Sequence, residues 1–382
     1  MYSIAQFGEM MADKVRMDAY AQALRDCVKP DSVVLDIGTG TGIFALLACK
    51  LGARRVFAVE PSDAIQVARD LAVANGCAER IEFFQALSTR VTLPERADVI
   101  VSDLRGVLPL HGEHLDAIAD ARRRHLAPGG VLLPRSDSLW AALVQSEREY
   151  RRVNVPWAEG VHGIEMRPVS SLVANQWWRA DVVPKDLLST PACWAQIDYA
   201  SVDNADAEGE ITLVAAQAGT THGICMWFDA QLSDTVRYSN AAGAGELVYG
   251  RAFFPWLRPM RLEAGDQVRL RLQARFTGGD YLWTWNSTFH DSAGAVKGNF
   301  RQSTFLGMPL VPGRLGRQSA SHVPQLGEDG KIDMRVLEMM SQRVALGEIA
   351  DLLASQFPSR FADGRAALVH VAALSVRYGR DS

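Results

Sequence analysis

Three glycines occupy alternate positions in one short segment: Gly38, Gly40 and Gly42. They follow an apolar run that ends near Asp36, and an apolar helical pattern begins after them. Glycines at such a junction let the backbone approach a ligand closely and adopt φ values that other residues avoid. The spacing is not the GxGxxG of dinucleotide-binding proteins, because Ile43 stands where the last glycine would be.

A second acidic residue, Glu60, directly follows the next predicted strand, twenty residues after Gly40. A carboxylate at this place can accept hydrogen bonds from both hydroxyl groups of a ribose, as the acidic residue of nucleotide-binding folds does. The glycine turn alone is weak evidence for such a site, and Glu60 at this distance strengthens it. A glycine-rich turn in some other α/β protein is the alternative interpretation.

These residues require a framework of alternating strands and helices. The apolar patterns predict strands at 32–37, 55–59, 81–85 and 97–102, and helices at 43–51 and 64–75. Such alternation is typical of parallel βαβ units. We therefore expect residues 1–135 to form an α/β domain with a Rossmann-like parallel sheet, whose ligands bind at the carboxyl ends of the strands.

The pattern changes after Pro134. Residues 267–276 alternate apolar and polar side chains, which predicts a half-buried antiparallel strand. Shorter runs of this kind predict an antiparallel β-barrel or sandwich over residues 136–310. Residues 311–330 have the composition of a linker, and residues 331–382 are expected to form a helical module. That module could be winged-helix-like or bind peptides, or it could be a bundle that packs on the barrel.

Composition and charge exclude several classes of protein. The chain has 382 residues and a net charge of −4, which argues against a protein that covers nucleic acid with positive charge. No apolar run is long enough for a membrane span, and the charged start does not resemble a signal peptide. The five cysteines are widely spaced and form no CxxC pair, so we expect a reduced, cytoplasmic protein without a structural metal site.

The strand, glycine turn, helix and Glu60 together resemble the class I S-adenosylmethionine-dependent methyltransferases. Residues 7–16, FGEMMADKVR, are similar to the N-terminal helix of the protein arginine methyltransferases, although three residues between Phe-Gly and Glu-Met are missing. Residues 102–106, SDLRG, and Glu113 stand where that family has Ser-Glu-Trp-Met-Gly and a second Glu. We suspect a bacterial-type relative of that family.

The resemblance implies S-adenosyl-L-methionine as cofactor and S-adenosyl-L-homocysteine as product. It implies that Asp36 meets the cofactor's ammonium, that Arg16 forms a fork with its carboxylate, and that Ala86 and Leu87 lie near its adenine. Met10 would lie beside the reacting methyl group. The full set of residues expected to bind the cofactor is Phe7, Arg16, Asp36, Gly38, Thr39, Gly40, Gly42, Glu60, Pro61, Ala86 and Leu87.

The same resemblance makes Asp103 and Glu113 the expected acceptor carboxylates. Two carboxylates would fix the plane of a guanidinium and keep its charge away from the attacking nitrogen. One of them, or His111 or His114, could then take the proton. Arg105 could instead pair with Asp103 and hold it. The alternative for the pair is two solvated loop carboxylates.

The departures from the family fall on the acceptor side. Asp103 is one methylene shorter than the family's Glu, its spacing to Glu113 is one residue longer, and residues 247–250 replace the Thr-His-Trp loop. Methylation of an arginine in a protein or peptide is the first hypothesis. A methyltransferase acting on the oxygen or nitrogen of a small metabolite or biosynthetic peptide is the second, and a non-catalytic cofactor-binding scaffold is the third. The resemblance further implies a homodimer, formed through an arm at about 157–178.

Overall fold

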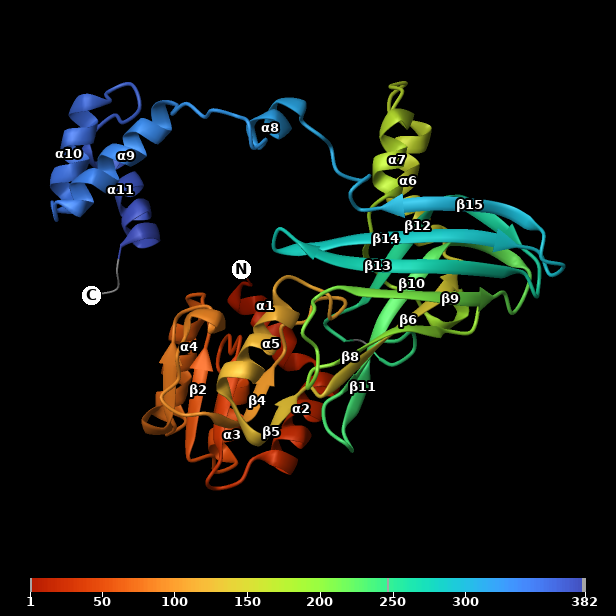
Figure 1. Ribbon diagram of the computed structural model, residues 1–382, viewed down its shortest axis with the longest axis horizontal. Helices are drawn as coiled ribbons and strands as arrows, with labels where there is room; N and C mark the ends of the chain where they lie inside the picture. Colours follow the sequence, from red (N-terminus) through yellow and green to blue (C-terminus); the bar gives the residue numbers. More distant parts are fainter. Residues whose placement is uncertain (1, 246, 380–382) are drawn as a thin grey trace. The chain divides into compact units, whose positions relative to one another are not determined.

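A five-stranded parallel sheet forms the N-terminal part of the computed structural model, in the order β3-β2-β1-β4-β5 (Figure 1). The strands are β1 Val33–Ile37, β2 Arg55–Val59, β3 Ile81–Phe84, β4 Ala97–Ser102 and β5 Leu126–Leu133. The helices are α1 Ile4–Ala12, α2 Lys14–Cys27, α3 Ile43–Lys50, α4 Ala64–Ala74 and α5 His114–His125. The predicted strands and helices are confirmed to within one residue. The structure describes residues 2–245 and 247–379.

The strand order places two functional loops next to each other. From β1 the chain continues to β2 and β3 on one side of β1, whereas β4 and β5 lie on its other side. The direction in which the chain adds strands to the sheet therefore reverses between β1 and β4. The register pairs Ile37 with Ser102, the last residues of these two strands. The glycine turn after β1 and the Asp103 loop after β4 therefore leave the sheet side by side, where open α/β sheets bind ligands.

Two antiparallel sheets follow. One has the order β7-β12-β10-β6-β8 with β11 beside β10, and the other has the order β15-β14-β13-β9. Their strands are β6 Ser136–Val144, β7 Trp178–Ala180, β8 Ala192–Asp198, β9 Ala207–Val214, β10 Gly219–Gln231, β11 Arg237–Ser239, β12 Arg251–Leu262, β13 Gln267–Thr277, β14 Asp280–His290 and β15 Val296–Ser303. In β13 the side chains of Val268, Leu270 and Leu272 are buried between exposed arginines, which confirms the predicted period of two.

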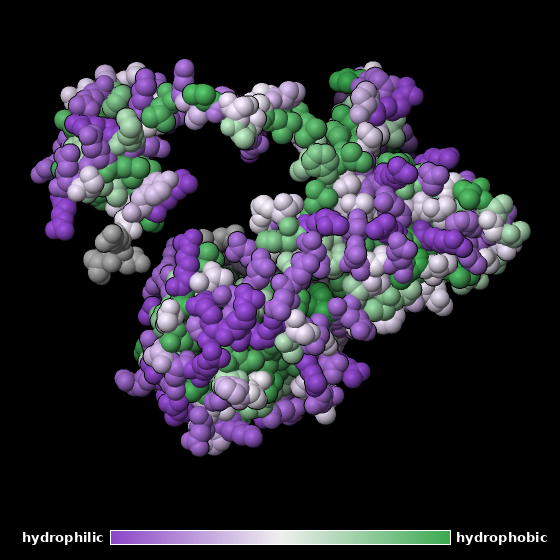
Figure 2. All heavy atoms as spheres, in the orientation of Figure 1, coloured by the Kyte–Doolittle hydropathy of each residue, from purple (hydrophilic) through white to green (hydrophobic). Residues whose placement is uncertain are grey.

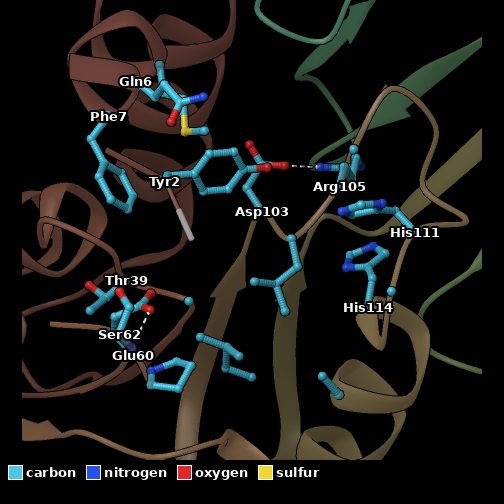
Figure 3. A pocket seen from close by; sticks show the side chains of 18 of the residues that line it. Tyr2, Gln6, Phe7, Thr39, Glu60, Ser62, Asp103, Arg105, His111 and His114 are labelled. Atoms are coloured by element: carbon cyan, nitrogen blue, oxygen red, sulfur yellow. Dashed lines mark hydrogen bonds and ion pairs between the residues drawn. The ribbon is translucent and has the colours of Figure 1, made fainter. Parts of the chain in front are cut away.

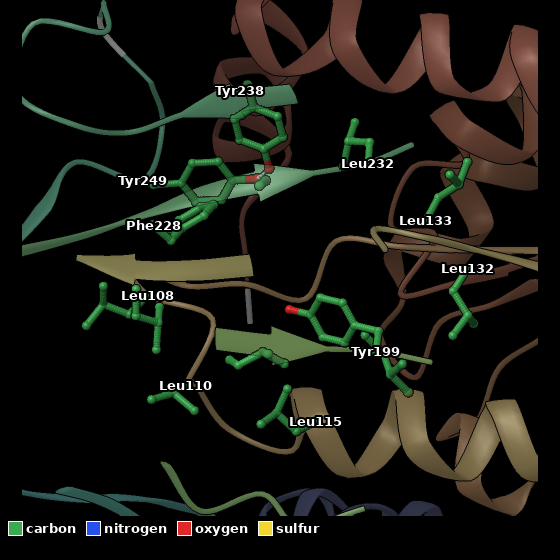
Figure 4. Packing of buried hydrophobic residues seen from close by; sticks show 14 of the residues in the cluster. Leu108, Leu110, Leu115, Leu132, Leu133, Tyr199, Phe228, Leu232, Tyr238 and Tyr249 are labelled. Atoms are coloured by element: carbon green, nitrogen blue, oxygen red, sulfur yellow. Dashed lines mark hydrogen bonds between the residues drawn. The ribbon is translucent and has the colours of Figure 1, made fainter. Parts of the chain in front are cut away.

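One continuous apolar core joins the parallel sheet to the antiparallel sheets. Figure 4 shows part of it, with Leu108, Leu110 and Leu115 on the cofactor-domain side and Tyr199 and Phe228 on the barrel side. The two predicted domains, 1–135 and 136–310, consequently belong to one compact unit of residues 1–308.

A helical arm interrupts the barrel between β6 and β7. It consists of α6 Glu147–Glu159, the 3₁₀ turn η3 Arg167–Val169 and α7 Ser170–Ala174. Val161 and Ile164 form an isolated bridge between its helical segments, and both are exposed. The arm thus begins at 147, ten residues before the predicted start, and Trp178 already belongs to β7.

Residues 309–382 form a second compact unit. Its helices are α8 Pro312–Arg317, α9 Glu328–Ser341, α10 Leu346–Gln356 and α11 Gly364–Tyr378. The last three bury an apolar core of their own around Val336, Ile349 and Val371. The predicted linker at 311–330 contains the short helix α8, and its last three residues already belong to α9. Residues 309–379 form only helices, turns and irregular segments, so the described part of the unit lacks the strands of a winged helix. The predicted module's residues 380–382 lie outside the described residues.

Large apolar side chains are exposed along the segment after β15, where Figure 2 shows them gathered. They are Phe305, Leu306, Met308, Leu310 and Val311. Within the described residues, no helix is both long enough and apolar enough to cross a membrane.

Candidate active site

A cavity of about 790 Å³ opens at the carboxyl ends of β1, β2 and β4 (Figure 3). Its walls include most of the residues predicted from the sequence: Phe7, Met10, Arg16, Gly38, Thr39, Glu60, Pro61, Ala86, Leu87, Asp103 and Glu113. The other three, Asp36, Gly40 and Gly42, belong to β1 and the glycine turn that forms its floor. The fold therefore brings the predicted cofactor residues and the predicted acceptor residues together around one cavity.

The glycine turn is tightly packed against its neighbours. All three glycines have positive φ, with values of 70° at Gly38, 54° at Gly40 and 88° at Gly42. A Cβ atom at Gly40 would lie 2.5 Å from Cε1 of Phe7, and one at Gly38 would overlap the side chain of Leu104. Glycine is thus required here both for backbone conformation and for space. The contact also places α1 directly over the turn.

Asp36 is wholly buried beneath this turn. Its Oδ2 accepts hydrogen bonds from the hydroxyl of Thr39 at 2.5 Å and from the backbone N–H of Ala45 at 2.9 Å. Its Oδ1 has no hydrogen-bond partner among the residues that the structure describes. Burial raises the pKa of Asp36 to about 7, against the opposing effect of these two hydrogen bonds. A carboxylate with a buried, unpartnered oxygen is well suited to a cationic group.

Glu60 connects the glycine turn to the end of β2. Its Oε2 accepts a hydrogen bond from the backbone N–H of Gly40 at 3.1 Å, and its Oε1 accepts one from the backbone N–H of Ser62 at 2.9 Å. Each carboxylate oxygen can accept a further hydrogen bond. Glu60 is thus oriented by the backbone and still able to accept from a ligand in the cavity.

Asp103 is held inside the protein by three side chains. Its Oδ2 lies 2.5 Å from Nε of Arg16 and accepts a hydrogen bond from the hydroxyl of Tyr249 at 2.5 Å, while its Oδ1 lies 3.0 Å from Nη1 of Arg105. Burial alone would raise the pKa of Asp103, but Arg16 and Arg105 outweigh it and hold the pKa below its usual range. The expected role of Asp103 in bracketing an acceptor stays a prediction, and here both of its oxygens are already engaged.

Arg16 links the first two helices to this carboxylate. Besides its ion pair with Asp103, it donates from Nη1 to the backbone carbonyl of Met10 at 3.2 Å. Asp13, one turn earlier, caps α2 and accepts a hydrogen bond from the backbone N–H of Val248 at 2.8 Å. This hydrogen bond links residues 247–250, the segment expected in place of a Thr-His-Trp loop, to α2.

Arg105 is the centre of a buried polar cluster that extends into the barrel. Its Nε and Nη2 donate to the two oxygens of Asp137 at 2.8 and 2.9 Å, and its Nη1 donates to the hydroxyl of Tyr20 at 2.8 Å. Asp137 also accepts a hydrogen bond from the hydroxyl of Tyr199 at 2.5 Å. The two buried guanidinium groups, Arg16 and Arg105, are thus matched in charge by two buried carboxylates, Asp103 and Asp137.

Glu113 differs from Asp103 in its surroundings. It is exposed, lines the cavity, and its carboxylate has no hydrogen bond or ion pair within residues 2–245 and 247–379. His111 and His114, which Figure 3 labels, also line the cavity and come from the same loop and the start of α5. Nε2 of His114 lies 2.9 Å from the hydroxyl of Tyr199, and burial and the nearby Arg105 lower the pKa of His114 to about 3. His114 is therefore a neutral, buried imidazole.

The described residues contain no cluster of three or more His, Cys, Asp or Glu side chains that could hold a metal ion.

Two protein families match the chain in succession. Residues 19–133 match the family described as ribosomal protein L11 methyltransferase (PrmA), and residues 135–274 match the arginine methyltransferase oligomerization subdomain. The two matches meet where the parallel sheet ends and the antiparallel sheets begin.

Complete proteins similar to the chain agree with these matches. Protein arginine N-methyltransferase 6 from Danio rerio is 31% identical over 232 residues, which are 58% of this chain and 66% of the relative. The Xenopus laevis protein of the same name is 30% identical over 232 residues, 58% of this chain and 68% of the relative. The chain belongs to the protein arginine N-methyltransferase family.

Solved structures of arginine methyltransferases share the fold. The structure of Arabidopsis thaliana protein arginine methyltransferase 10 superposes with a TM-score of 0.70 at 23% identity, over 79% of this chain and 97% of that chain. The Trypanosoma brucei PRMT1 enzyme–prozyme heterotetrameric complex with AdoHcy gives 0.72 at 21% identity, over 78% and 96%. These similarities confirm the predicted Rossmann-like domain followed by antiparallel sheets.

Several residues around this arginine methyltransferase site were not predicted. Asp137, Tyr199 and Tyr249 hold the Asp103 loop from the barrel, and Trp177 and Arg179 line the cavity from the segment at β7. None of them belongs to a short motif with the loop residues they contact. The position of residues 247–250 opposite the family's Thr-His-Trp loop was the only signal that pointed to Tyr249.

Proposed function

We propose that this chain transfers a methyl group from S-adenosylmethionine to a side-chain nitrogen of an arginine in a protein or peptide. The observation that carries the proposal is the single cavity whose walls combine the glycine turn and Glu60 on one side with the exposed carboxylate of Glu113 on the other. Family membership supplies the reaction class, and the cavity supplies a place where cofactor and acceptor can meet.

The cofactor fits the residues that surround the glycine turn. The unpartnered Oδ1 of Asp36 suits its ammonium, and Glu60 has acceptor capacity left for the ribose hydroxyls. Arg16 would hold the carboxylate, and Ala86 and Leu87 would lie near the adenine. The bound cofactor supplies a methyl group on a sulfonium, which is electrophilic without further activation.

The chain's own residues then bind the acceptor and exclude water. Glu113 would hold the guanidinium with charge-assisted hydrogen bonds and orient one nitrogen toward the methyl group. Met10 and Phe7 would cover the reacting atoms from α1, because both line the cavity from that helix. In this proposal Asp103 acts mainly by fixing Arg16 and the acceptor loop, which is the segment 103–113 between β4 and α5, since both of its oxygens are engaged.

We also infer that the chain forms a homodimer through its arm. The matched oligomerization subdomain includes the arm, and the Trypanosoma brucei relative was solved as a heterotetramer. Val161 and Ile164 are exposed between the helical segments of the arm, as expected for residues that a partner covers. Sedimentation of the wild type and of Ile164→Asp tests this inference, with a dimer expected for the first and a monomer for the second.

We further place the protein in the cytoplasm, because its five cysteines are free thiols.

The test of the main proposal is a mass-resolved assay on peptides. The purified chain, S-adenosylmethionine and a peptide library with a central arginine should yield products heavier by one or two CH₂ groups, located on that arginine by fragmentation. Methylation of a small-molecule pool without any arginine product would support the second hypothesis instead. Binding of S-adenosylhomocysteine without turnover of either pool would support a non-catalytic scaffold.

A further inference from the structure

His111 lies in the wall of the cavity, two residues before Glu113 (Figure 3). Its backbone N–H donates to the carbonyl of Pro109 at 3.0 Å, and its own carbonyl accepts from the N–H of His114 at 3.2 Å. Its ring packs against Gly106, where a Cβ atom would lie 2.8 Å from Cγ and 3.0 Å from Nδ1 of the imidazole. Backbone hydrogen bonds thus hold the loop at His111, the ring lies against Gly106, and the side chain remains exposed.

The proposed reaction releases a proton that some group must accept. An acceptor nitrogen that gains a methyl group forms one new bond to carbon, and the donor sulfur keeps the electron pair of the bond that breaks. The nitrogen must then lose one proton to return its guanidinium to a single positive charge. Efficient transfer requires a base within hydrogen-bond reach of that nitrogen.

Most titratable groups around the cavity are poorly suited to take this proton. Asp103 has a lowered pKa and both of its oxygens already accept hydrogen bonds, and His114 is buried, with its Nε2 at hydrogen-bond distance from the hydroxyl of Tyr199. Burial raises the pKa of Tyr20, Tyr199, Tyr238 and Tyr249, which therefore stay protonated. The charged or titratable groups that remain in the cavity wall are Tyr2 ahead of α1, Glu9 from α1, Arg16 from α2, Glu60 after β2, Arg105, His111 and Glu113 from the acceptor loop, and Arg179 from β7.

Of these groups, His111 combines three properties that a proton acceptor needs. It is on the acceptor loop beside Glu113, which would hold the guanidinium. Its side chain forms no hydrogen bond within the described part of the chain, so a ring nitrogen is free to accept. Its exposure lets the proton pass on to water. Imidazole is also the side chain that changes charge nearest neutral pH.

Resting on the proposed function, we propose that His111 is the catalytic base that accepts the proton from the methylated arginine nitrogen. The free ring nitrogen of His111 forms a bond to that proton and becomes an imidazolium, and the electron pair of the N–H bond stays on the guanidinium. Water then takes the proton and restores the neutral ring. Glu113 keeps the acceptor in place throughout.

The first test compares the wild type with His111→Gln on an arginine peptide across pH 5.5 to 9. Loss of a general base reduces turnover by about 10²–10⁴-fold. We therefore expect kcat to fall at least a hundredfold and the acid limb of its pH profile to disappear, while KM and the affinity for S-adenosylhomocysteine change less than twofold. His322→Gln, an exposed histidine of the second unit, is the matched control and should leave both quantities unchanged.

A second test does not depend on turnover. The ring signals of the histidines are titrated by NMR in the presence of S-adenosylhomocysteine, and the His111 signal is identified by its absence in His111→Gln. Adding an arginine peptide should move the titration of His111 to lower pH, because a nearby cation disfavours the imidazolium. A citrulline peptide, which lacks the charge, should not move it.

The outcomes separate this inference from the proposed function. A wild-type protein that methylates no arginine peptide overturns the proposed function and the role of His111 with it. A wild-type protein that is active, together with a His111→Gln variant that keeps its kcat and its acid limb, overturns only the role of His111. An unmoved His111 titration in the presence of a bound arginine peptide does the same.

Discussion

Arg105 and Asp137 form a two-pronged ion pair between the acceptor loop and the barrel. Nε and Nη2 of Arg105 lie 2.8 and 2.9 Å from the two oxygens of Asp137, and both side chains are fully buried. Arg105 follows β4 of the parallel sheet, and Asp137 is the second residue of β6. The pair therefore fixes the loop that carries Asp103, His111 and Glu113 relative to the second sheet system.

Removing one partner of this pair should be costly. Arg105→Met leaves the buried carboxylates of Asp137 and Asp103 without their shared cation, and breaking a buried pair in this way costs about 3–5 kcal/mol. We expect a decrease of that size in the free energy of unfolding, measured by urea titration. Arg261→Met removes an exposed pair with Glu263 and should cost less than about 1 kcal/mol.

A double variant tests whether the cost comes from the unpaired charge. Arg105→Met combined with Asp137→Leu leaves neither buried charge of the pair, so its destabilisation should be smaller than the sum of the two single changes. Strict additivity would show that the two side chains do not stabilise each other.

The two predicted acceptor carboxylates should behave differently when they are neutralised. Glu113→Gln should lower kcat/KM for an arginine peptide at least a hundredfold, because the exposed carboxylate is free to bind the substrate. Its affinity for S-adenosylhomocysteine should stay within twofold. Asp103→Asn, in contrast, should weaken the binding of S-adenosylhomocysteine, because Arg16 loses the partner that fixes it.

Calorimetric titration with S-adenosylhomocysteine distinguishes these roles. If Asp103→Asn bound as tightly as the wild type and lost only turnover, Asp103 would act directly on the acceptor. If Glu113→Gln lost the ligand, Glu113 would belong to the cofactor site.

The cofactor side of the site could be predicted from the sequence because its information is local. Asp36 and the three glycines lie within seven residues, and Glu60 follows at the end of the next strand. A strand, a tight turn and a helix of this kind have characteristic apolar patterns and residue types. Their mutual positions then follow from the parallel sheet itself, since adjacent strands end at the same edge.

The acceptor side could be predicted only in part, because its state depends on distant residues. Asp103 was found as a motif position, but its pairing is decided by Arg16 from α2 and by Tyr249 from the barrel, 146 residues further along the chain. Asp137 lies before every recognisable barrel motif in the sequence, and the residues around it do not predict that its side chain is buried. Side-chain pairing of this kind depends on tertiary packing, which neither spacing nor periodicity encodes.

Binding of the cofactor should depend on pH through Asp36. Burial raises its pKa to about 7, so the free protein holds a proton there at lower pH, and the ammonium of a bound ligand favours the ionised form. The affinity for S-adenosylhomocysteine should therefore rise up to tenfold per pH unit between about pH 5.5 and 7 and then level off. Calorimetric titration with S-adenosylhomocysteine, in buffers that differ in ionisation enthalpy, should detect the release of up to one proton when the ligand binds.

The same group sets the sign of a stability change. The unfolded chain loses the Asp36 proton near the ordinary aspartate pKa of about 3.9, whereas the folded chain keeps it up to about pH 7. The contribution of Asp36 to stability is thus present below the unfolded pKa and falls as the pH rises between these values.

The variant Asp36→Asn tests the binding prediction, because it should bind S-adenosylhomocysteine more weakly and without the pH dependence. A wild-type affinity that is flat from pH 5.5 to 7 would contradict an ammonium contact at Asp36.

Residues 309–382 should be removable without loss of the cofactor site. The unit of residues 1–308 and the C-terminal helices each bury a core of their own, and every residue in the cavity wall has a number below 250.

All nine tryptophans lie between 140 and 285, so tryptophan fluorescence reports only on the first unit. A chain that ends at Met308 should unfold at the same urea concentration by fluorescence and bind S-adenosylhomocysteine within twofold of the full chain. Because α9, α10 and α11 are lost, its far-ultraviolet circular dichroism should show less helix. A shifted fluorescence midpoint or a weaker affinity would mean that the helical unit contributes to the fold of the catalytic unit. The two units would then depend on each other even though each has its own core.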